Sequence, residues 1–372
     1  MLDTVKTEQV KFTPEQGFEA AVLYTSNKNT EYVPVEGNQL IMTDSGTLNG
    51  WTFAYKGIED ICKDISLPSL AKSLHTKTIN HWDSYEYFNA VMATEESQRK
   101  LKKKRLVVED GCIIGTVGSK YVHYPNSEFL TDIAKIVPSD YKFTGGNVVG
   151  SKMRVNFGSE SLSFDVKGRV NDKIVPGIQF RTSHVGDTVI GALVRLYRYK
   201  CLNGMTITDT KSDNRAYHVG DDLRYKLSLM TQRTNNSLSK VQERIDRLLG
   251  IDYILGESAG DLLYNNAPVR ILPEHKKRSA LFNPKTKYKD EKVRDEVLLN
   301  SIKILDNIPN DHGGPISRGI LNSSFRERKS YFDWTESFTE AAQSYSIEEQ
   351  NLIEEEAGVL SSYIYDNATL LN

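Results

Sequence analysis

Hydrophobic and polar positions alternate along much of the chain between residues 106 and 208, as they do in half-buried β-strands. Two such runs are Met153, Val155 and Phe157, then Leu162, Phe164 and Val166, separated by a turn at 158–159. Further strands are predicted around 177–183, over 189–200 and at 205–208. The pattern therefore predicts a meander of about four or five antiparallel strands.

A hairpin and two helices flank these strands. Asp110-Gly111 separates two short apolar runs, and glycine accepts the positive φ that a type I′ hairpin turn requires. The spacing then changes to 3.6 residues, with Asn126 or Ser127 as a helix cap and Pro138 as a stop. The buried face of that helix is Phe129, Ile133 and Ile136. A second helix is predicted over 238–249.

The fold class expected is α+β, an antiparallel β-meander flanked by helices, with a mixed N-terminal region and an acidic C-terminal helical segment. Four regions follow: an N-terminal α+β region (1–100), the central helix–β-meander–helix domain (101–255), a basic irregular region containing Pro and Gly (256–330), and acidic helices (331–372). Within the first, residues 51–55 alternate as a strand, and Pro68 divides the helical stretch 58–74 into two.

Composition is that of an ordinary globular protein, with 39% hydrophobic and 26% charged residues. The N-terminus has no secretory pattern, and no aliphatic run is long enough to span a bilayer. Three widely spaced cysteines favour reduced thiols over a disulfide framework. We therefore expect a soluble, cytoplasmic protein with no membrane partner.

The charge is divided unevenly along the chain. Residues 330–372 contain nine acidic residues and no lysine or arginine, and subtracting those nine charges from the net −2 leaves +7 for residues 1–329. A cationic body with an anionic tail is typical of proteins that handle nucleic acid.

The acidic tail has helical patterning. Asp333 with Glu336, and Ser346 with Glu349, fit the spacing of a capping box. Apolar stripes follow each cap: Phe338, Ala341, Ala342 and Tyr345, then Ile353, Ala357, Leu360 and Ile364. The tail is either a pair of surface helices docked on the body or an element that binds a protein partner or masks a site.

Two basic segments could contact phosphates. The first lies within 99–105 and the second begins near 275. The candidate residues are Lys102, Lys103, Lys104, Arg105, Lys276, Lys277 and Arg278. A solvated connector is the alternative for the first segment.

The predicted strand 189–200 carries a third candidate site for nucleic-acid binding. Alternation places Leu193, Arg195, Tyr197 and Tyr199 on one face, which combines a cation with two phenol rings. Unpaired bases stack on such rings whatever their sequence. Alternatively, the tyrosines pack against a helix.

Candidate enzyme chemistry is weaker, and no catalytic residue, metal or cofactor is assigned. Cys201 has no histidine beside it, and the acids Asp209, Asp213, Asp221 and Asp222 also suit a solvated loop with a helix cap. Gly145–Lys152 departs from the phosphate-binding loop because strand residues, not a helix, follow it.

Two segments carry a resemblance: Glu109–Val117 with Tyr121 and Asn126, and Arg181–Asp187 followed by Arg195–Met205. Over roughly residues 100–250 the chain resembles a family of phage- and plasmid-like proteins that carries a domain of unknown function. His184-Val185, and Tyr199-Lys200 before Cys201, depart from that family's usual residues. The resemblance implies a mobile-element origin, with the host cytoplasm as the location of a phage-encoded protein, and it supplies no catalytic residues.

The function expected is a phage or mobile-element DNA-metabolism protein that binds nucleic acid, with single strands favoured. The helix–meander–helix order is similar to the gross plan of single-strand annealing proteins, which implies an accessory role in annealing or recombination and a homo-oligomer. The alternatives are a protein that binds a host factor through residues 331–372, and a metal-dependent nuclease.

Overall fold

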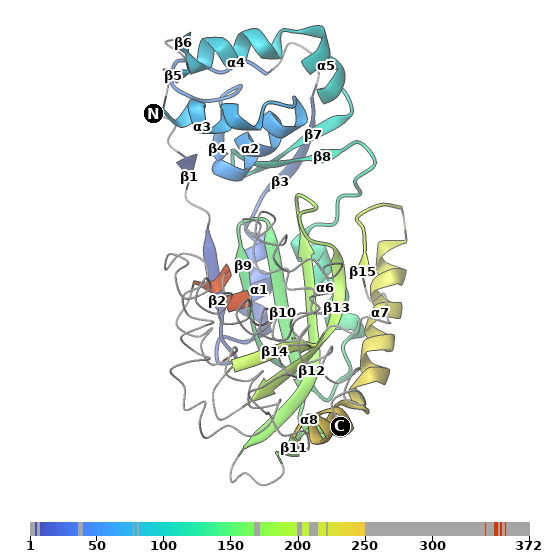
Figure 1. The fold of residues 1–372 in the computed structure, drawn as a ribbon. Helices are drawn as coiled ribbons and strands as arrows, with labels where there is room; N and C mark the ends of the chain where they lie inside the picture. Colours follow the sequence, from blue (N-terminus) through green and yellow to red (C-terminus); the bar gives the residue numbers. More distant parts are fainter. Residues whose placement is uncertain are drawn as a thin grey trace, which may run out of the picture.

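The computed structural model describes residues 4–5, 8–35, 40–76, 78–79, 82–166, 172–198, 203–207, 215–220 and 222–249, together with residues 339, 346–348, 350–351 and 354. These residues form two tiers, each built on its own β-sheet (Figure 1). The chain is α+β, and its larger sheet is antiparallel, as predicted.

The upper tier contains a five-stranded sheet in the order β1-β4-β8-β7-β3. Its strands are β1 (Thr4–Val5), β3 (Thr30–Pro34), β4 (Thr52–Ala54), β7 (Lys104–Glu109) and β8 (Cys112–Gly118). Its helices are α2 (Tyr55–Asp64), α3 (Pro68–Thr76), α4 (Ser84–Met92) and α5 (Glu95–Leu101), with a small hairpin of β5 (Thr78–Ile79) and β6 (Trp82–Asp83). Phe53, Ile58, Phe88 and Ile113 lie in its buried core.

Local signals in the upper tier are confirmed. The strand predicted over 51–55 is β4, and α3 begins at Pro68, where the proline divides the helical stretch. Asp110 and Gly111 have φ of 49° and 79°, so they supply the two left-handed residues of a type I′ turn between β7 and β8.

The lower tier is an antiparallel sheet in the order β14-β13-β12-β10-β9-β2, with β11 paired to β12 and β15 to β13. Its strands are β2 (Gln9–Phe12), β9 (Tyr141–Val149), β10 (Lys152–Ser159), β11 (Phe164–Asp165), β12 (Lys173–Ser183), β13 (Ile190–Arg198), β14 (Asn203–Ile207) and β15 (Arg215–Ala216). From β9 to β14 the order follows the sequence, which confirms the meander. β11 departs from the prediction, because residues 160–162 form a short 3₁₀ turn (η2, Glu160–Leu162) that carries the chain to β12.

Both tiers use residues from both sides of position 100. β2 and α1 (Gly17–Ser26), near the N-terminus, belong to the lower tier, while the β7–β8 hairpin completes the upper sheet. The division into folding units at residue 100 stays a prediction. The sheets themselves are assembled by pairings between strands distant in sequence.

Helices cover one face of the lower sheet. These are α1, α6 (Asn126–Ile136) and α7 (Leu223–Leu238), which is followed by α8 (Val241–Leu249) where a single helix was expected. In α6 the residue before the first turn is Pro125, and no side chain caps it. The predicted caps Asn126 and Ser127 therefore lie inside the helix.

The core of the lower tier lies between these helices and the sheet. Val155, Ile178, Phe180 and Val194 contribute its sheet side. Phe129 and Ile133 of α6 are fully buried there, and Ile136 packs at its margin, as the helical spacing predicted. Alternation therefore places the remaining residues of β10, β12 and β13 on the other face of the sheet.

Gly177 in the middle of β12 permits the close approach of β10. A Cβ at this position would lie 1.8 Å from the Phe157 carbonyl oxygen, whereas a Cβ at Gly118 in β8 would meet nothing within 4 Å. We predict that Gly177→Ala lowers the free energy of unfolding by about 3 kcal/mol, because the strands must separate to admit the methyl group. Gly118→Ala is the matched control, with a change within about 0.5 kcal/mol. Urea denaturation of both variants checks this, and equal midpoints would contradict the close packing.

Candidate nucleic-acid interface

The second face of the lower sheet, which we call the polar face, is lined by cationic and amide side chains. It comprises Lys11, Asn147, Lys152, Arg154, Asn156, Gln179, Arg181, Arg195 and Tyr197. The neighbours of these residues along the strands, including Val155, Phe180 and Val194, face the helices instead. One face of the sheet is therefore apolar, and the other carries these charged and amide side chains together with the buried Val149, Val175 and Leu193.

The pairing of the strands aligns these side chains. Arg154 of β10 lies opposite Asn147 of β9 on one side and Arg181 of β12 on the other. Arg195 of β13 lies opposite Gly177, further along the same face. Adjacent strands are about 4.8 Å apart, so three arginines from three consecutive strands share one continuous surface.

The polar face is nevertheless buried in its centre, because every residue of β12 after Lys173 is buried. A guanidinium is stable in such a place only when it is paired and hydrogen-bonded. Arg195 Nη1 lies 2.7 Å from Glu354 Oε2, and the two side chains are only 9% and 2% exposed. An ion-pair partner of this buried arginine therefore comes from the acidic end of the chain.

Three residues of the C-terminal segment, at a spacing of three, contact the polar face. Besides Glu354, Glu348 Oε1 lies 3.5 Å from Lys152 Nζ. The side-chain amides of Asn351 and Asn147 exchange hydrogen bonds of 2.9 and 3.1 Å. Residues three apart lie on the same side of a helix, so a single helical stripe faces the sheet.

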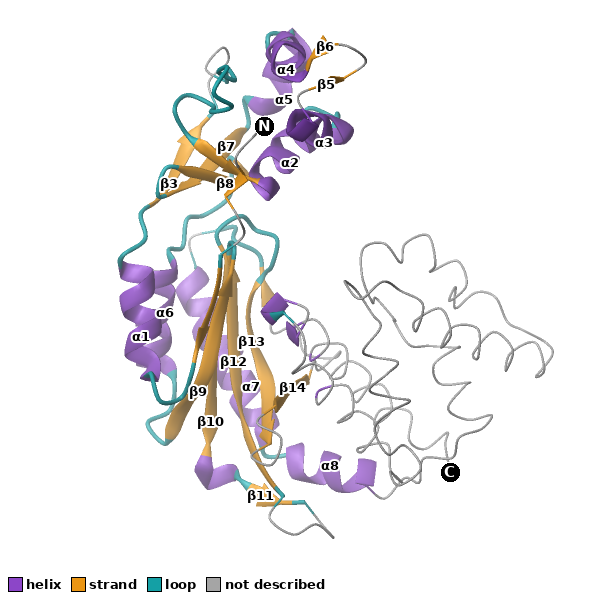
Figure 2. Ribbon diagram, turned by 90° about the vertical axis from the view of Figure 1, so that its left-hand side faces the viewer, coloured by secondary structure: helices purple, strands orange, loops and turns teal. Residues whose placement is uncertain are grey.

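The contact also uses the backbone of the segment. Arg154 Nη1 donates to the Asn351 carbonyl oxygen at 3.3 Å. The Gln350 amide donates to the Ser346 carbonyl oxygen at 2.8 Å, and helical residues begin at Ile347, directly after the predicted cap Ser346. The described part of the segment is thus a helix that starts where the capping pattern placed it. Its described residues lie on the side of the sheet opposite α1 and α6 (Figure 2).

The predicted strand site is placed as alternation suggested. Arg195 shares the polar face with Tyr197, which is half-buried and whose phenol pKa is raised mainly by that burial. Tyr199 lies outside the described residues, as do Lys276, Lys277 and Arg278 of the second basic segment. The proposed stacking platform is therefore described only up to Tyr197.

The first basic segment lies elsewhere. Lys102 and Lys103 are exposed in the turn between α5 and β7 of the upper tier. Lys104 pairs with Asp64, and Arg105 donates to the Ser119 carbonyl oxygen. The structure does not bring these four residues onto the polar face.

Sequence reasoning missed Arg154 and Arg181. Both alternate with core residues, Arg154 between Met153 and Val155 and Arg181 between Phe180 and Thr182, so the alternation that predicted the strands already carried this signal. Their neighbourhood on one surface came only from the pairing of β10 with β12.

Residues suggested for enzyme chemistry are only partly described. Asp222 forms an ion pair with Lys226 at 2.7 Å, while Cys201 and the acids at 209, 213 and 221 lie outside the described residues. Within the described ranges no three His, Cys, Asp or Glu side chains are grouped so as to hold a metal ion. Residues 145–152 form the end of β9, a turn and the start of β10, not a loop leading to a helix.

No helix in the part of the chain that the structure describes is long and apolar enough to cross a membrane. Comparison with protein-family models, with curated proteins and with solved structures found no match to this chain. The resemblance to phage- and plasmid-like proteins therefore stays a prediction.

Proposed function

We propose that the polar face of the lower sheet binds single-stranded nucleic acid, and that the acidic C-terminal segment occupies this face until a strand displaces it. One observation carries the proposal. Arginines from three neighbouring strands share a surface, and the segment that covers it presents Glu348 and Glu354 to the cations.

The carboxylates occupy positions that suit phosphate groups. Arginine pairs with carboxylate and phosphate through the same forked N–H donors. A strand that displaced the segment would meet Lys152, Arg154, Arg181 and Arg195 in its place. Neutralising four phosphates of a single strand gives a slope of about −3 for log K against log salt concentration.

A single strand suits this face better than a duplex does. Unpaired bases stack on aromatic side chains of a sheet, and Tyr197 stands on the same face as Arg195. On the sequence resemblance alone, we place the protein in phage or mobile-element DNA metabolism, as an accessory of annealing or recombination. A cytoplasmic location and a homo-oligomer belong to the same proposal.

A protein partner for the acidic residues is the second candidate function. Glu348 and Glu354 face the sheet, so a host factor that captured the segment 331–372 would also uncover the arginines. Binding of a partner and binding of nucleic acid would then be positively coupled. Nothing in the described residues favours the nuclease alternative.

Neutralising the segment should strengthen binding. We predict that the double variant Glu348→Gln, Glu354→Gln binds a single-stranded oligonucleotide at least about tenfold more tightly than the unmodified chain, since two charge-assisted contacts that compete with the strand are lost. Fluorescence anisotropy at low salt measures this. The control is Glu86→Gln, an exposed residue of the upper tier. An unchanged affinity in the double variant would contradict the proposal that the segment competes with the strand, and would give the segment only a structural role.

Removing cations from the polar face should weaken binding. The double variant Arg154→Gln, Arg195→Gln tests this. Each substitution removes one phosphate contact and should therefore make the slope of log K against log salt concentration shallower by about 0.7. Lys102→Gln with Lys103→Gln is the comparison, and we expect a smaller change because both residues lie in the upper tier. If the upper-tier pair alone reduces the slope, the interface lies on the basic run instead. If no variant binds at low salt, the proposal fails.

A further inference from the structure

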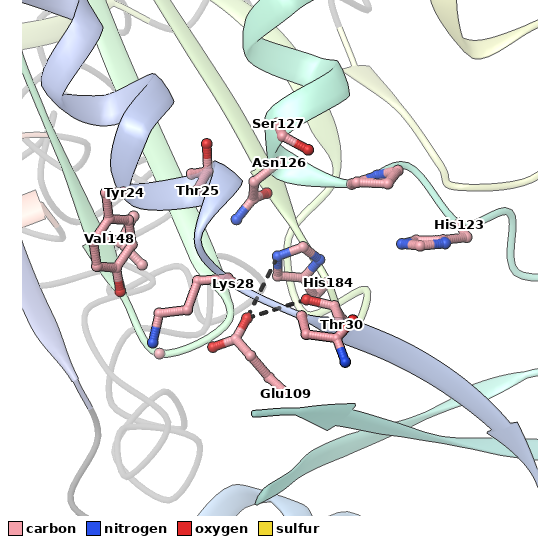
Figure 3. A pocket seen from close by; sticks show the side chains of 13 residues that line it. Tyr24, Thr25, Lys28, Thr30, Glu109, His123, Asn126, Ser127, Val148 and His184 are labelled. Atoms are coloured by element: carbon pink, nitrogen blue, oxygen red, sulfur yellow. Dashed lines mark hydrogen bonds and ion pairs between the residues drawn. The ribbon is translucent and has the colours of Figure 1, made fainter. Parts of the chain in front are cut away.

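A pocket of about 180 Å³ lies where the two tiers meet, on the helix-covered side of the lower sheet. α1 and the chain after it contribute Tyr24, Thr25, Lys28, Asn29 and Thr30; the loop before α6 and its first residues contribute His123, Pro125, Asn126 and Ser127. Glu109 enters from the upper sheet and His184 from the end of β12 (Figure 3). Asn29 is exposed at the rim, whereas Asn126 and His184 are buried.

Two buried atoms that line this pocket have no hydrogen-bond partner among the described residues. They are Asn126 Oδ1 and His184 Nδ1, on side chains that are 7% and 4% exposed. A buried polar atom left unpaired costs about 1–3 kcal/mol, so such atoms in native proteins call for a physical reason. Their shared position in one pocket suggests a ligand that pairs with both.

His184 presents a lone pair to the pocket. Burial lowers the pKa of its imidazole to about 4, so the ring is neutral at pH 7. Its Nε2 lies 3.8 Å from Glu109 Oε2, beyond hydrogen-bond range, and the negative charge of that carboxylate favours the tautomer that carries the ring hydrogen on Nε2. Nδ1 is then a hydrogen-bond acceptor, as Asn126 Oδ1 is.

The carboxyl group of Glu109 is a third acceptor. Glu109 is partly buried, accepts a hydrogen bond from Thr30 Oγ1 at 3.3 Å, and has its pKa raised mainly by desolvation. The nearby Lys28 already contacts Glu8 and Asp110, at 2.8 and 3.2 Å. These three groups are hydrogen-bond acceptors, so they suit a ligand that carries N–H donors.

Three residues with rings, Tyr24, His123 and His184, are among those that line the pocket. Figure 3 shows Asn126, His184 and Glu109 around the same part of it. Since a cavity of about 150 Å³ holds benzene, a pocket of this size admits a heterocycle of one or two small rings.

We infer that this pocket binds a nucleobase that bears an exocyclic amino group, adenine or cytosine. The amino hydrogens would meet the acceptors Asn126 Oδ1, His184 Nδ1 and the Glu109 carboxyl. Asparagine is a common partner of adenine, and glutamate accepts from the cytosine amino group. The pocket lies on the opposite face of the sheet from the arginines, so this inference does not rest on the proposed function.

Paired nucleosides test the inference by calorimetric titration of the full chain at pH 7. Adenosine against purine riboside, and cytidine against pyrimidin-2-one riboside, differ by the amino group alone and keep the ring nitrogens as acceptors. At least one amino member should bind about tenfold or more tightly than its partner without the amino group, because the buried acceptors then stay unpaired. Equal binding within both pairs, or no binding of any nucleoside, would overturn the inference.

Two variants of the lining residues connect the binding to this pocket. Asn126→Leu and Glu109→Gln should each weaken binding of the preferred nucleoside about tenfold, whereas Glu31→Gln, an exposed residue of β3 outside the lining, should not. Asn126→Leu should also keep the denaturation midpoint, since it removes an unpaired buried atom; Glu109→Gln provides the test if that variant fails to fold. Full affinity in both folded variants would overturn the assignment.

A competition experiment distinguishes a pocket for free nucleosides from a pocket for bases in a strand. If the pocket takes a base of a bound strand, oligo(dA) or oligo(dC) should compete with the preferred nucleoside; if it takes free nucleosides only, neither should. Nucleoside binding should persist in the Arg154→Gln, Arg195→Gln variant. Failure of the strand-binding proposal is thereby distinguished from failure of this one.

Discussion

The ion pair between Arg195 and Glu354 is the contact on which the arrangement of this protein depends. A sheet covered by helices on one face normally exposes its polar face to water, which hydrates the charges there. Here β12 and β13 are buried on both faces, and the second face holds arginines. Removing one partner of a buried ion pair typically costs about 3–5 kcal/mol, so the buried arginine needs an anionic partner, which the acidic segment supplies.

The energy balance of a buried ion pair also makes the acidic segment replaceable. A buried ion pair contributes little net stability, because desolvation offsets the attraction between the charges. The segment therefore satisfies the arginines without being bound much more strongly than another anion would be. Two carboxylates at 348 and 354 and the polar groups of Asn351 resemble the charge and hydrogen-bonding pattern of a nucleic-acid backbone. Exchange between segment and strand is then decided by salt, concentration and the number of contacts.

Local features of this fold could be predicted from the sequence. Asp110-Gly111 determines its turn through the φ angles it accepts, Pro68 begins a helix, and the alternation around Val155 and Val194 gives strands with the correct inward residues. Even the start of the C-terminal helix after Ser346 followed from a capping pattern. Each of these depends on residues close together in the chain.

What could not be predicted depends on pairing across long separations. Nothing near Gln9 indicates that β2 joins β9, and nothing near Arg154 indicates that Arg181 will lie beside it. The junction pocket combines residues between 24 and 184 from both tiers, so its orphaned acceptors Asn126 and His184 have no local signature. The basic run 102–105 shows the converse: a strong local signal that the fold places away from the polar face.

The central claim is that the C-terminal segment and a nucleic-acid strand compete for one face of the sheet. Cysteines introduced by Asn147→Cys and Asn351→Cys, at positions whose side chains contact each other, can be joined by a short bifunctional thiol reagent that forms reducible disulfides, which would lock the segment on the sheet. Peptide mapping identifies the 147–351 cross-link, and anisotropy with a single-stranded oligonucleotide then compares the cross-linked protein with the same protein after reduction. The account predicts that the cross-linked protein does not bind and that reduction restores binding. Equal binding in both states would contradict it.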